Sequence, residues 1–169
     1  MNNIVIGLGN PGVKYQNNRH NIGHMFVDWF KGQKVGKSKK WNFELSKTNS
    51  YMNDSGPEIK QMISKFPSFS ISNLFISHDD LDLRLGNFKI QKGTGPKVHN
   101  GLSSIEDALG TKDFWRIRIG VDNRDSDHRG TGEDYVLSDF TIEEKQVLET
   151  IFPQILSRLI LVQKNIEKT

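Results

Sequence analysis

The fold is decided by the stretch IVIGLGNPGVKYQNNRHNIGHMFVDWF, residues 4–30, near the start of the chain. Its first residues, Ile4–Ile6, are all β-branched and apolar, which is typical of a short buried strand. From Ile22 to Phe30 the apolar residues recur every three or four positions, the period of a helix with one buried face. A strand, a polar loop and a helix in this order favour an α/β fold, in which loops at the carboxyl ends of strands line the ligand crevice.

The polar loop holds two side chains suited to chemistry, Asn10 near its start and His20 at its end. We expect His20 to lie in the first turn of the helix. The positive end of the helix dipole disfavours an imidazolium ion there and keeps the ring neutral near pH 7. A neutral imidazole can act as a general base.

The glycines of this loop, Gly7, Gly9 and Gly12, also have the G-x-G-x-x-G spacing of a dinucleotide-binding loop. Pro11, however, removes a backbone N–H from the turn that would face the pyrophosphate. No apolar stripe follows Gly12, and the acidic residue expected about 20 positions later at a strand end is missing. The sequence therefore argues against a dinucleotide cofactor.

The length of 169 residues favours one domain over residues 1–169 with a sizeable core. The absence of cysteine excludes disulfides and thiolate metal sites. No apolar run approaches the ~18 residues that a membrane span needs, and no leader precedes the first strand, so we expect a soluble cytoplasmic protein.

The net charge is +3, and the basic residues cluster, which favours a polyanionic partner. The clusters are Lys34–Lys40, Lys89–Lys97 and Arg116–Arg118.

The spacing of apolar residues predicts the remaining elements. Predicted strands are residues 41–45, 74–76, 87–91 (a hairpin partner of the strand before it) and 115–121, and further helices begin near residues 55, 100 and 141. Two capping boxes, Ser55–Glu58 and Thr141–Glu144, start helices, and Pro153 breaks or kinks the last one. We expect a mobile surface loop at Asp122–Asp134. The pattern predicts an α/β fold with a central twisted mixed β-sheet flanked by helices.

Ionisable side chains crowd the chain directly after the predicted strand 74–76. They are His78, Asp79, Asp80 and Asp82. Carboxylates crowded at a strand end are costly unless a cation or an imidazole uses them. Either a divalent metal binds here, or one aspartate orients a histidine base while the others stay solvated. The second interpretation is favoured because no other acidic cluster completes a set of oxygen ligands.

Two other polar segments lie at predicted helix starts. The loop 92–101 is basic and rich in glycine, and the N–H groups of the helix that begins at Asn100 suit an anion. A plain connector fits this loop equally well. Asn53 precedes another helix, where it is either a turn residue or a functional amide.

Taken in order, these segments resemble the bacterial-type peptidyl-tRNA hydrolase family over nearly the whole chain. The matching motifs are G-L-G-N-P-G-x-x-Y (7–15), R-H-N-x-G (19–23), Y-M-N-x-S-G (51–56), H-D-D-L-D-L (78–83), H-N-G-L (99–102) and R-I-R-I-G (116–120). Each motif alone is weak, and their order and joint presence make the match specific.

The resemblance implies an enzyme that hydrolyses the ester between a peptide and the 3′ end of tRNA, as a cytoplasmic monomer that needs no metal and no cofactor. It implies that His20 is the general base, that Asp79 holds and polarises it, and that Asn10 recognises the blocked, peptidyl end of the substrate. Implied substrate-binding residues are Tyr15, Tyr51, Asn53, His99 and Asn100, and implied contacts of tRNA phosphates are Lys89 and Arg118.

Two other functions stay open at this point. A non-catalytic RNA-binding protein would share the fold and the basic clusters, although the intact His20 and Asp79 argue against it. A metal-dependent hydrolase would use the cluster at residues 78–82. The hydrolase hypothesis requires His20 and Asp79 to meet in one crevice ringed by the three asparagine amides.

Overall fold

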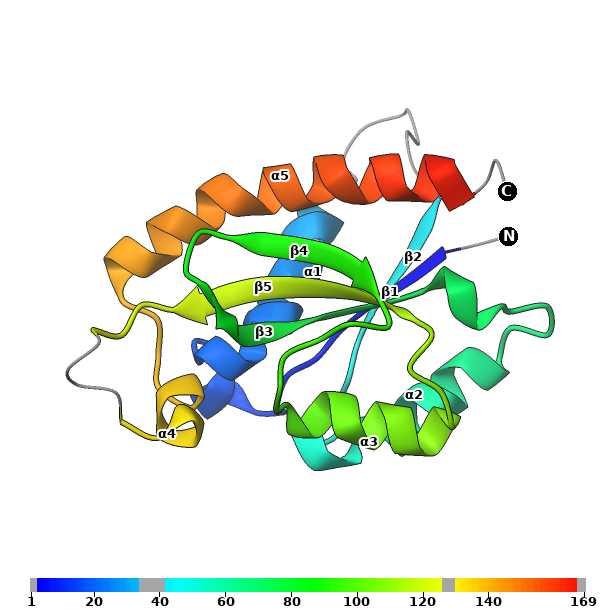
Figure 1. The fold of residues 1–169 in the computed structure, drawn as a ribbon, viewed down its shortest axis with the longest axis horizontal. Helices are drawn as coiled ribbons and strands as arrows, with labels where there is room; N and C mark the ends of the chain where they lie inside the picture. The colour runs from blue at the N-terminus through cyan, green and yellow to red at the C-terminus, as the bar shows by residue number, and fades with distance from the viewer. Residues whose placement is uncertain (1–2, 34–41, 126–129, 167–169) are drawn as a thin grey trace.

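The structure is a computed structural model that describes residues 3–33, 42–125 and 130–166. At its centre is one mixed sheet of five strands with helices on both faces (Figure 1). The predicted α/β fold with a central mixed sheet flanked by helices is therefore confirmed. The lysine cluster Lys34–Lys40 and the predicted strand start at Trp41 lie outside the described residues.

The strands are β1 (Asn3–Gly7), β2 (Phe43–Lys47), β3 (Leu74–Arg84), β4 (Phe88–Lys92) and β5 (Trp115–Asp122). They lie in the order β2-β1-β3-β5-β4. All neighbours are parallel except β4, which runs antiparallel to β5 at the edge of the sheet. The inner strands are nearly continuous buried runs, as expected for parallel strands covered on both faces.

The helices are α1 (Ile22–Gly32), α2 (Ser55–Ser64), α3 (Asn100–Leu109), α4 (Gly132–Val136) and α5 (Ile142–Ile166). Helices α1 and α5 pack on one face of the sheet, against side chains such as Val5 and Phe75. Helices α2 and α3 cover the other face, against Ile6 and Ile76. Neighbouring residues of a strand thus point into two separate apolar layers. No helix in the described ranges is long and apolar enough to cross a membrane.

The start of α1 crosses the carboxyl ends of β1 and β3 at very short range. A Cβ added to Gly23 would lie 2.2 Å from the carbonyl oxygen of Ser77, and one added to Gly7 would lie 2.3 Å from the carbonyl oxygen of Gly23. Only glycine avoids these clashes with backbone atoms. The contact fixes the 3₁₀ turn Arg19–Asn21, which directly precedes α1, over the ends of the strands.

Strand β3 is longer than the sequence predicts. A loop is expected after Ile76, but the strand continues to Arg84 because β5 pairs with this part of it, with Asp79 opposite Ile119. The acidic cluster therefore lies on a strand, and its alternate side chains point to opposite faces. Strand β1 ends opposite Ser77, so Asp79 lies past the end of β1.

The predicted hairpin between β3 and β4 is wrong. Strand β4 pairs with β5, which lies between β3 and β4 in the sheet. Most of β5 is fully buried, whereas β4 consists of exposed and half-buried residues. The buried strand takes the inner position, and the amphipathic strand forms the edge.

The two predicted capping boxes differ in outcome. Thr141 and Glu144 form one, because the Glu144 N–H donates to Thr141 Oγ1 (3.2 Å) and the Thr141 N–H donates to Glu144 Oε2 (2.9 Å). Ser55 and Glu58 do not form the other. The Ser55 side chain is fully buried, and the Glu58 carboxylate accepts the backbone N–H groups of residues 49–50 instead.

Pro153 does not break the last helix, because α5 continues through it from residue 142 to residue 166. The predicted loop Asp122–Asp134 is also shorter than expected. Strand β5 includes Asp122, and α4 begins at Gly132. Residues 126–129 lie outside the described part of the chain.

The substitution Gly23→Ala tests the close crossing of α1 and the sheet. We expect it to lower the free energy of unfolding, because the new methyl group meets backbone atoms. Overpacking typically costs about 1–3 kcal/mol, and this clash should cost at least as much. Gly32→Ala is the control on the same helix, since nothing lies within 4 Å of its added Cβ. It should be neutral or stabilise the protein by about 0.4–1 kcal/mol. Urea unfolding measures both values, and equal stabilities of the two variants would contradict the crossing.

Candidate active site

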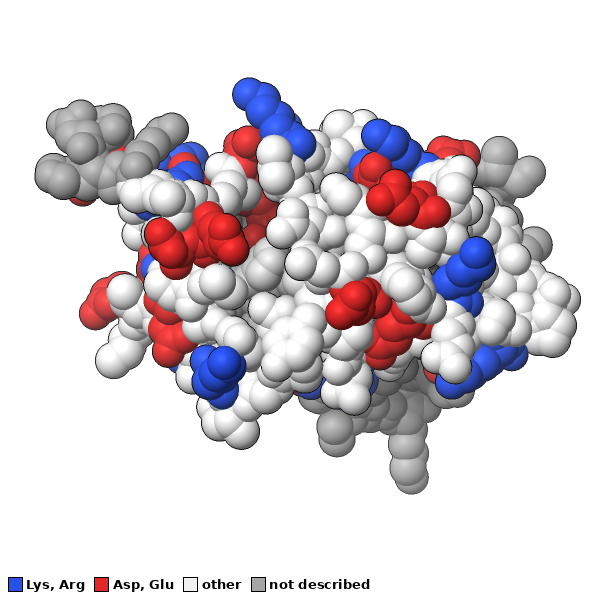
Figure 2. All heavy atoms as spheres, turned by 90° about the horizontal axis from the view of Figure 1, so that it is seen from below, with Lys and Arg blue, Asp and Glu red and all other residues white. Residues whose placement is uncertain are grey.

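A cavity of about 610 Å³ lies at the carboxyl ends of β1 and β3, between the start of α3 and α4. Figure 2 shows the face of the molecule that carries these two helices. Seven of the side chains singled out in the sequence line the cavity: Asn10, His20, Tyr51, Asn53, Asp79, His99 and Asn100. The structure thus brings His20 and Asp79 into one crevice with the three amides, while the roles of these side chains stay predictions.

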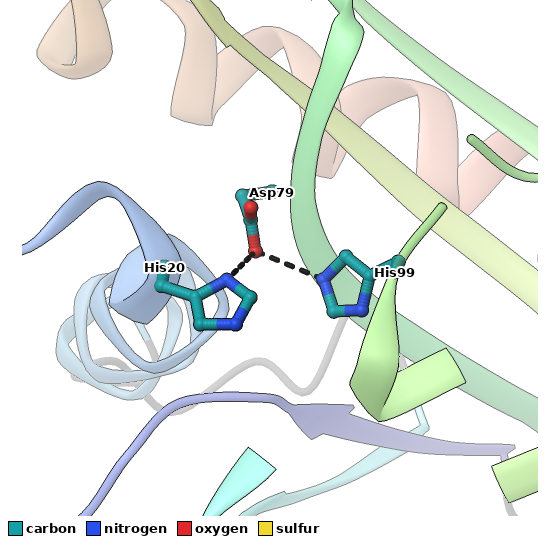
Figure 3. Close-up of side chains that lie close together, drawn as sticks. All are labelled: His20, Asp79 and His99. Carbon is teal, nitrogen blue, oxygen red and sulfur yellow. Dashed lines mark hydrogen bonds and ion pairs between the residues drawn. The ribbon is translucent and has the colours of Figure 1, made fainter. Parts of the chain in front are cut away.

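One carboxylate oxygen holds two imidazole rings (Figure 3). Asp79 Oδ1 lies 2.8 Å from His20 Nδ1 and 2.9 Å from His99 Nε2. Burial raises the pKa of Asp79, but the two imidazoles outweigh burial and hold it far below its ordinary value. The carboxylate is therefore ionised at all ordinary pH values.

The hydrogen bonds of His99 fix the positions of the protons in this triad. The Leu102 N–H donates to His99 Nδ1 (3.3 Å), so the proton of the neutral ring is on Nε2 and is donated to Asp79. His20 Nδ1 also donates to the carboxylate, which leaves a lone pair on its Nε2. That nitrogen has no partner among the described residues, and the His20 side chain is 13% exposed. This is the arrangement of an imidazole base oriented by a carboxylate.

The pKa of His20 depends on burial and on the neighbouring carboxylate. Burial lowers it, but the charge of Asp79 and the hydrogen bond to Asp79 raise it, and the net result is a pKa above 6.5. The helix dipole acts against this increase, because it disfavours the imidazolium ion. An ionised carboxylate 2.8 Å away outweighs the partial charge of a helix end.

The side chain of Arg19 fixes the position of the turn that bears His20. Its Nη1 donates to the Asp139 carbonyl (2.8 Å), and its Nη2 donates to the Glu144 carboxylate (2.5 Å). The guanidinium carbon also lies 4.2 Å from the ring centroid of Tyr135. These contacts tie the turn to α4, to α5 and to the segment between them, so α4 has a defined position relative to His20.

Asn10 is held by buried hydrogen bonds. The Asn21 side chain bonds both the N–H and the carbonyl of Asn10, each at 2.9 Å. Asn10 Oδ1 accepts the Met52 N–H, also at 2.9 Å. The Asn10 Nδ2 group has no partner in the described ranges, so it remains available as a donor at the cavity wall.

Three residues implied by the resemblance, Tyr15, Lys89 and Arg118, lie outside the cavity lining. Tyr15 packs edge to face against Tyr51, with ring centroids 6.4 Å apart, so it supports a residue that does line the cavity. Lys89 is exposed on the edge strand β4.

The arginines of β5 are buried, contrary to their expected place in a basic surface cluster. Arg118 Nε donates to Asp80 Oδ2 (2.6 Å) and its Nη1 donates to Gln91 Oε1 (2.8 Å). Arg116 Nη2 donates to Glu106 Oε1 (2.6 Å). The guanidinium of Arg118 is thus already neutralised inside the protein, and the structure gives no support to its expected phosphate contact.

The metal site considered at residues 78–82 does not form. His78 Nδ1 donates to the neighbouring Asp79 carbonyl at 2.7 Å. Asp80 pairs with a buried arginine, and Asp82 accepts the Lys97 N–H at 2.9 Å. These side chains point to different partners and do not converge on one point.

A second set, His20, Asp79 and His99, has nitrogen and oxygen atoms within 4.8 Å of one another and is close enough to hold a metal ion. Both imidazoles, however, direct N–H groups at the same carboxylate oxygen. The Leu102 N–H requires the His99 proton to stay on Nε2. A cation would have to displace both N–H groups, so these residues fit a hydrogen-bonded triad better than a metal site.

The sequence did not reveal the cavity wall contributed by α4. Gly132, Glu133, Val136 and Leu137 line this wall. The helix spans only residues 132–136, which is too short for a helical period to be recognised. The one signal was the T-x-x-D pattern at residues 131–134, a helix N-cap in which Thr131 Oγ1 accepts the Asp134 N–H at 3.1 Å.

The family model described as Peptidyl-tRNA hydrolase matches residues 4–169. The chain belongs to the peptidyl-tRNA hydrolase family. A peptidyl-tRNA hydrolase of Mycobacterium tuberculosis (strain ATCC 25177 / H37Ra) is 39% identical over 166 residues, which cover 89% of this chain and 85% of the relative. One of Lawsonia intracellularis is 35% identical over 181 residues, which cover 98% and 89%.

Solved peptidyl-tRNA hydrolases share the whole fold. A crystal structure of a peptidyl-tRNA hydrolase with N-propanol has a TM-score of 0.80 and 28% identity, and the match covers 99% of this chain and 91% of the other. The enzyme of Acinetobacter baumannii has a TM-score of 0.77 and 26% identity, with the same coverage. The family resemblance found in the sequence is therefore confirmed.

The protonation of His20 can be measured by NMR titration without substrate. We expect a His20 pKa above 6.5 in the unmodified protein. Asp79→Asn should lower it, because the charge that raises the pKa is removed and burial, which lowers it, remains. His24 and His78, with pKa values of about 4 and about 3, should stay neutral above pH 6.

Asp107→Asn is the matched control for this titration, because Asp107 is exposed on α3. It should leave the His20 pKa unchanged. A His20 pKa that does not respond to Asp79→Asn would contradict the hydrogen-bonded pair.

Proposed function

We propose that this protein hydrolyses the ester that joins a peptide to the 3′ end of tRNA, and that His20 is the general base. The observation that supports this role is the oriented imidazole, with Nδ1 bonded to Asp79 and Nε2 left without a partner among the described residues of the cavity. Membership in the peptidyl-tRNA hydrolase family supplies the substrate class.

In the proposed reaction, His20 Nε2 takes a proton from water while the water oxygen attacks the ester carbonyl carbon. The bond from that carbon to the ribose oxygen then breaks, and the imidazolium returns the proton to the departing oxygen. The water molecule is thus divided between the products: its hydroxyl group joins the peptide carbonyl carbon, and its proton joins the ribose oxygen of the tRNA. Asp79 stabilises the imidazolium and directs its Nδ1–H, and the His99 N–H holds the carboxylate in place.

The amides of the cavity suit the parts of the substrate that accept hydrogen bonds. Asn53 and Asn100 lie at helix starts and line the cavity, and we assign to them the donors for the developing oxyanion. The free Nδ2 of Asn10 suits the amide carbonyl that distinguishes a blocked peptidyl group from a free amino acid. Tyr51, supported by Tyr15, provides an aromatic surface for the substrate.

We further propose that the protein acts as a cytoplasmic monomer, folded as one domain, and recycles peptidyl-tRNA that has left translation. A non-catalytic RNA-binding function is not favoured, because the His20–Asp79 pair is assembled and the relatives are named as hydrolases.

Hydrolysis of N-acetyl-leucyl-tRNA, measured beside leucyl-tRNA with a free amine, tests the proposed function. We expect cleavage of the blocked substrate alone. His20→Ala should lower kcat by about 10²–10⁴-fold, the usual contribution of general base catalysis, with little change in KM. Full activity in His20→Ala would overturn the assignment. Loss of activity in a chelator, restored by a divalent ion, would instead support a metal-dependent hydrolase.

Lys89 and Arg118 should respond differently to substitution. Lys89→Ala is expected to weaken tRNA binding and to lower the slope of log affinity against log salt by about 0.7–0.9, the value for one phosphate contact. Arg118→Ala should lower the free energy of unfolding by about 3–5 kcal/mol, because it leaves Asp80 buried without its partner. Binding at several salt concentrations and urea unfolding separate the two effects. A stable Arg118→Ala with a reduced salt slope would restore its expected phosphate contact.

A further inference from the structure

Glu133 places an unpaired carboxylate in the wall of the cavity. It lies in the first turn of α4, and its side chain is exposed. It lines the same cavity as His20 and Asp79. Within residues 3–33, 42–125 and 130–166, no side chain forms a hydrogen bond or ion pair with this carboxylate.

Among the described residues that line the cavity, Glu133 also carries the negative charge that a ligand can reach. The other carboxylate, Asp79, is buried, and its Oδ1 is occupied by two imidazole N–H groups. None of the described residues of the lining is a lysine or an arginine. The charge of Glu133 is felt at the reacting centre, since it contributes to the raised pKa of His20. A ligand that enters the cavity therefore meets one uncompensated negative charge, on the α4 side.

Basic side chains gather on another side of the site. A second hollow of about 370 Å³ shares His99 with the cavity and is lined by Lys97, Lys112 and Arg116. Glu106, the carboxylate among its described lining residues, pairs with the buried Arg116 (2.6 Å) and with Lys112 (3.3 Å), so the three positive charges exceed the negative charge by two. Figure 2 shows acidic side chains at the end of the face where α4 lies and also over the part that carries α2 and α3. Among the described residues, the lining of the cavity is thus negative on the α4 side, and the lining of the second hollow beyond His99 is positive.

The substrate of the proposed reaction has two unlike halves, a polyanionic tRNA and a peptide. Glu133 repels phosphate groups, whereas the basic hollow attracts them. The tRNA half is therefore favoured on the side of α3, and the peptide half extends along α4. A peptide side chain near the ester then comes close to Glu133.

We propose that Glu133 is a specificity-determining residue that binds a basic side chain, lysine or arginine, of the peptide residue esterified to tRNA, and that it disfavours an acidic side chain there. This inference rests on the proposed function. An ion pair at a partly exposed position should favour a lysine substrate over a neutral one by roughly two- to fivefold. The preference should weaken as salt is added, because exposed charges are screened.

One tRNA esterified with N-acetyl-lysine, N-acetyl-norleucine or N-acetyl-glutamate provides the test. Norleucine has nearly the length of lysine without its charge, and the constant tRNA removes differences in tRNA binding. We expect kcat/KM to be highest for lysine and lowest for glutamate. Glu133→Gln should reduce the lysine-to-glutamate ratio by several-fold, and Glu133→Lys should reverse the order. Ratios within one variant cancel any general change in activity.

Glu149→Gln is the matched control, because it makes the same change of charge at an exposed position of α5 that does not line the cavity. Its lysine-to-glutamate ratio should equal that of the unmodified protein. An unchanged ratio in Glu133→Gln, with the norleucine substrate still cleaved, overturns the inference and leaves the proposed function intact. A shifted pH profile without a changed ratio also overturns it, since Glu133 then acts only on His20. Failure to cleave all three substrates overturns the proposed function and this inference with it.

Discussion

The backbone contact between Gly7 and Gly23 fixes α1 against the sheet, and the geometry of the active site depends on it. Side chains at either position would push the start of the helix away from the strand ends. His20 lies in the turn just before this helix, and its hydrogen bond to Asp79 is 2.8 Å long. Because a hydrogen bond weakens steeply with distance and misalignment, a small shift of α1 would separate the base from its carboxylate. Two residues without side chains thus position the His20–Asp79 pair.

Asp79 joins the two layers of the fold. It lies past the end of β1 on a strand that continues to Arg84, so its carboxylate reaches the crevice between the helices of the two faces. His20 approaches it from the α1 side, and His99 from the start of α3. A buried carboxylate is costly unless donors surround it, and these imidazoles supply the donors. The same hydrogen bonds stabilise the buried charge and direct the proton of the base.

The ionisable residues of the central strands show why residue type alone did not identify their roles. His78, Asp79 and Asp80 are neighbours in the sequence, but only Asp79 lines the cavity. Asp80 is buried and forms an ion pair with Arg118. The sequence could not distinguish this arginine from a surface cation. Strand alternation separates neighbouring side chains, and burial then decides whether a charge meets substrate or a partner inside the protein.

The sequence by itself determined the fold class, the family and half of the described residues that line the cavity. Local signals sufficed for these, because apolar periodicity, short motifs and polar residues at strand ends each depend on a few neighbouring residues. Only the tertiary structure decided the pairing of β4 with β5, the burial of Arg118 and the position of Glu133 in the cavity wall. Each of these depends on segments that are distant in the sequence, and their distance and burial arise only when the chain folds.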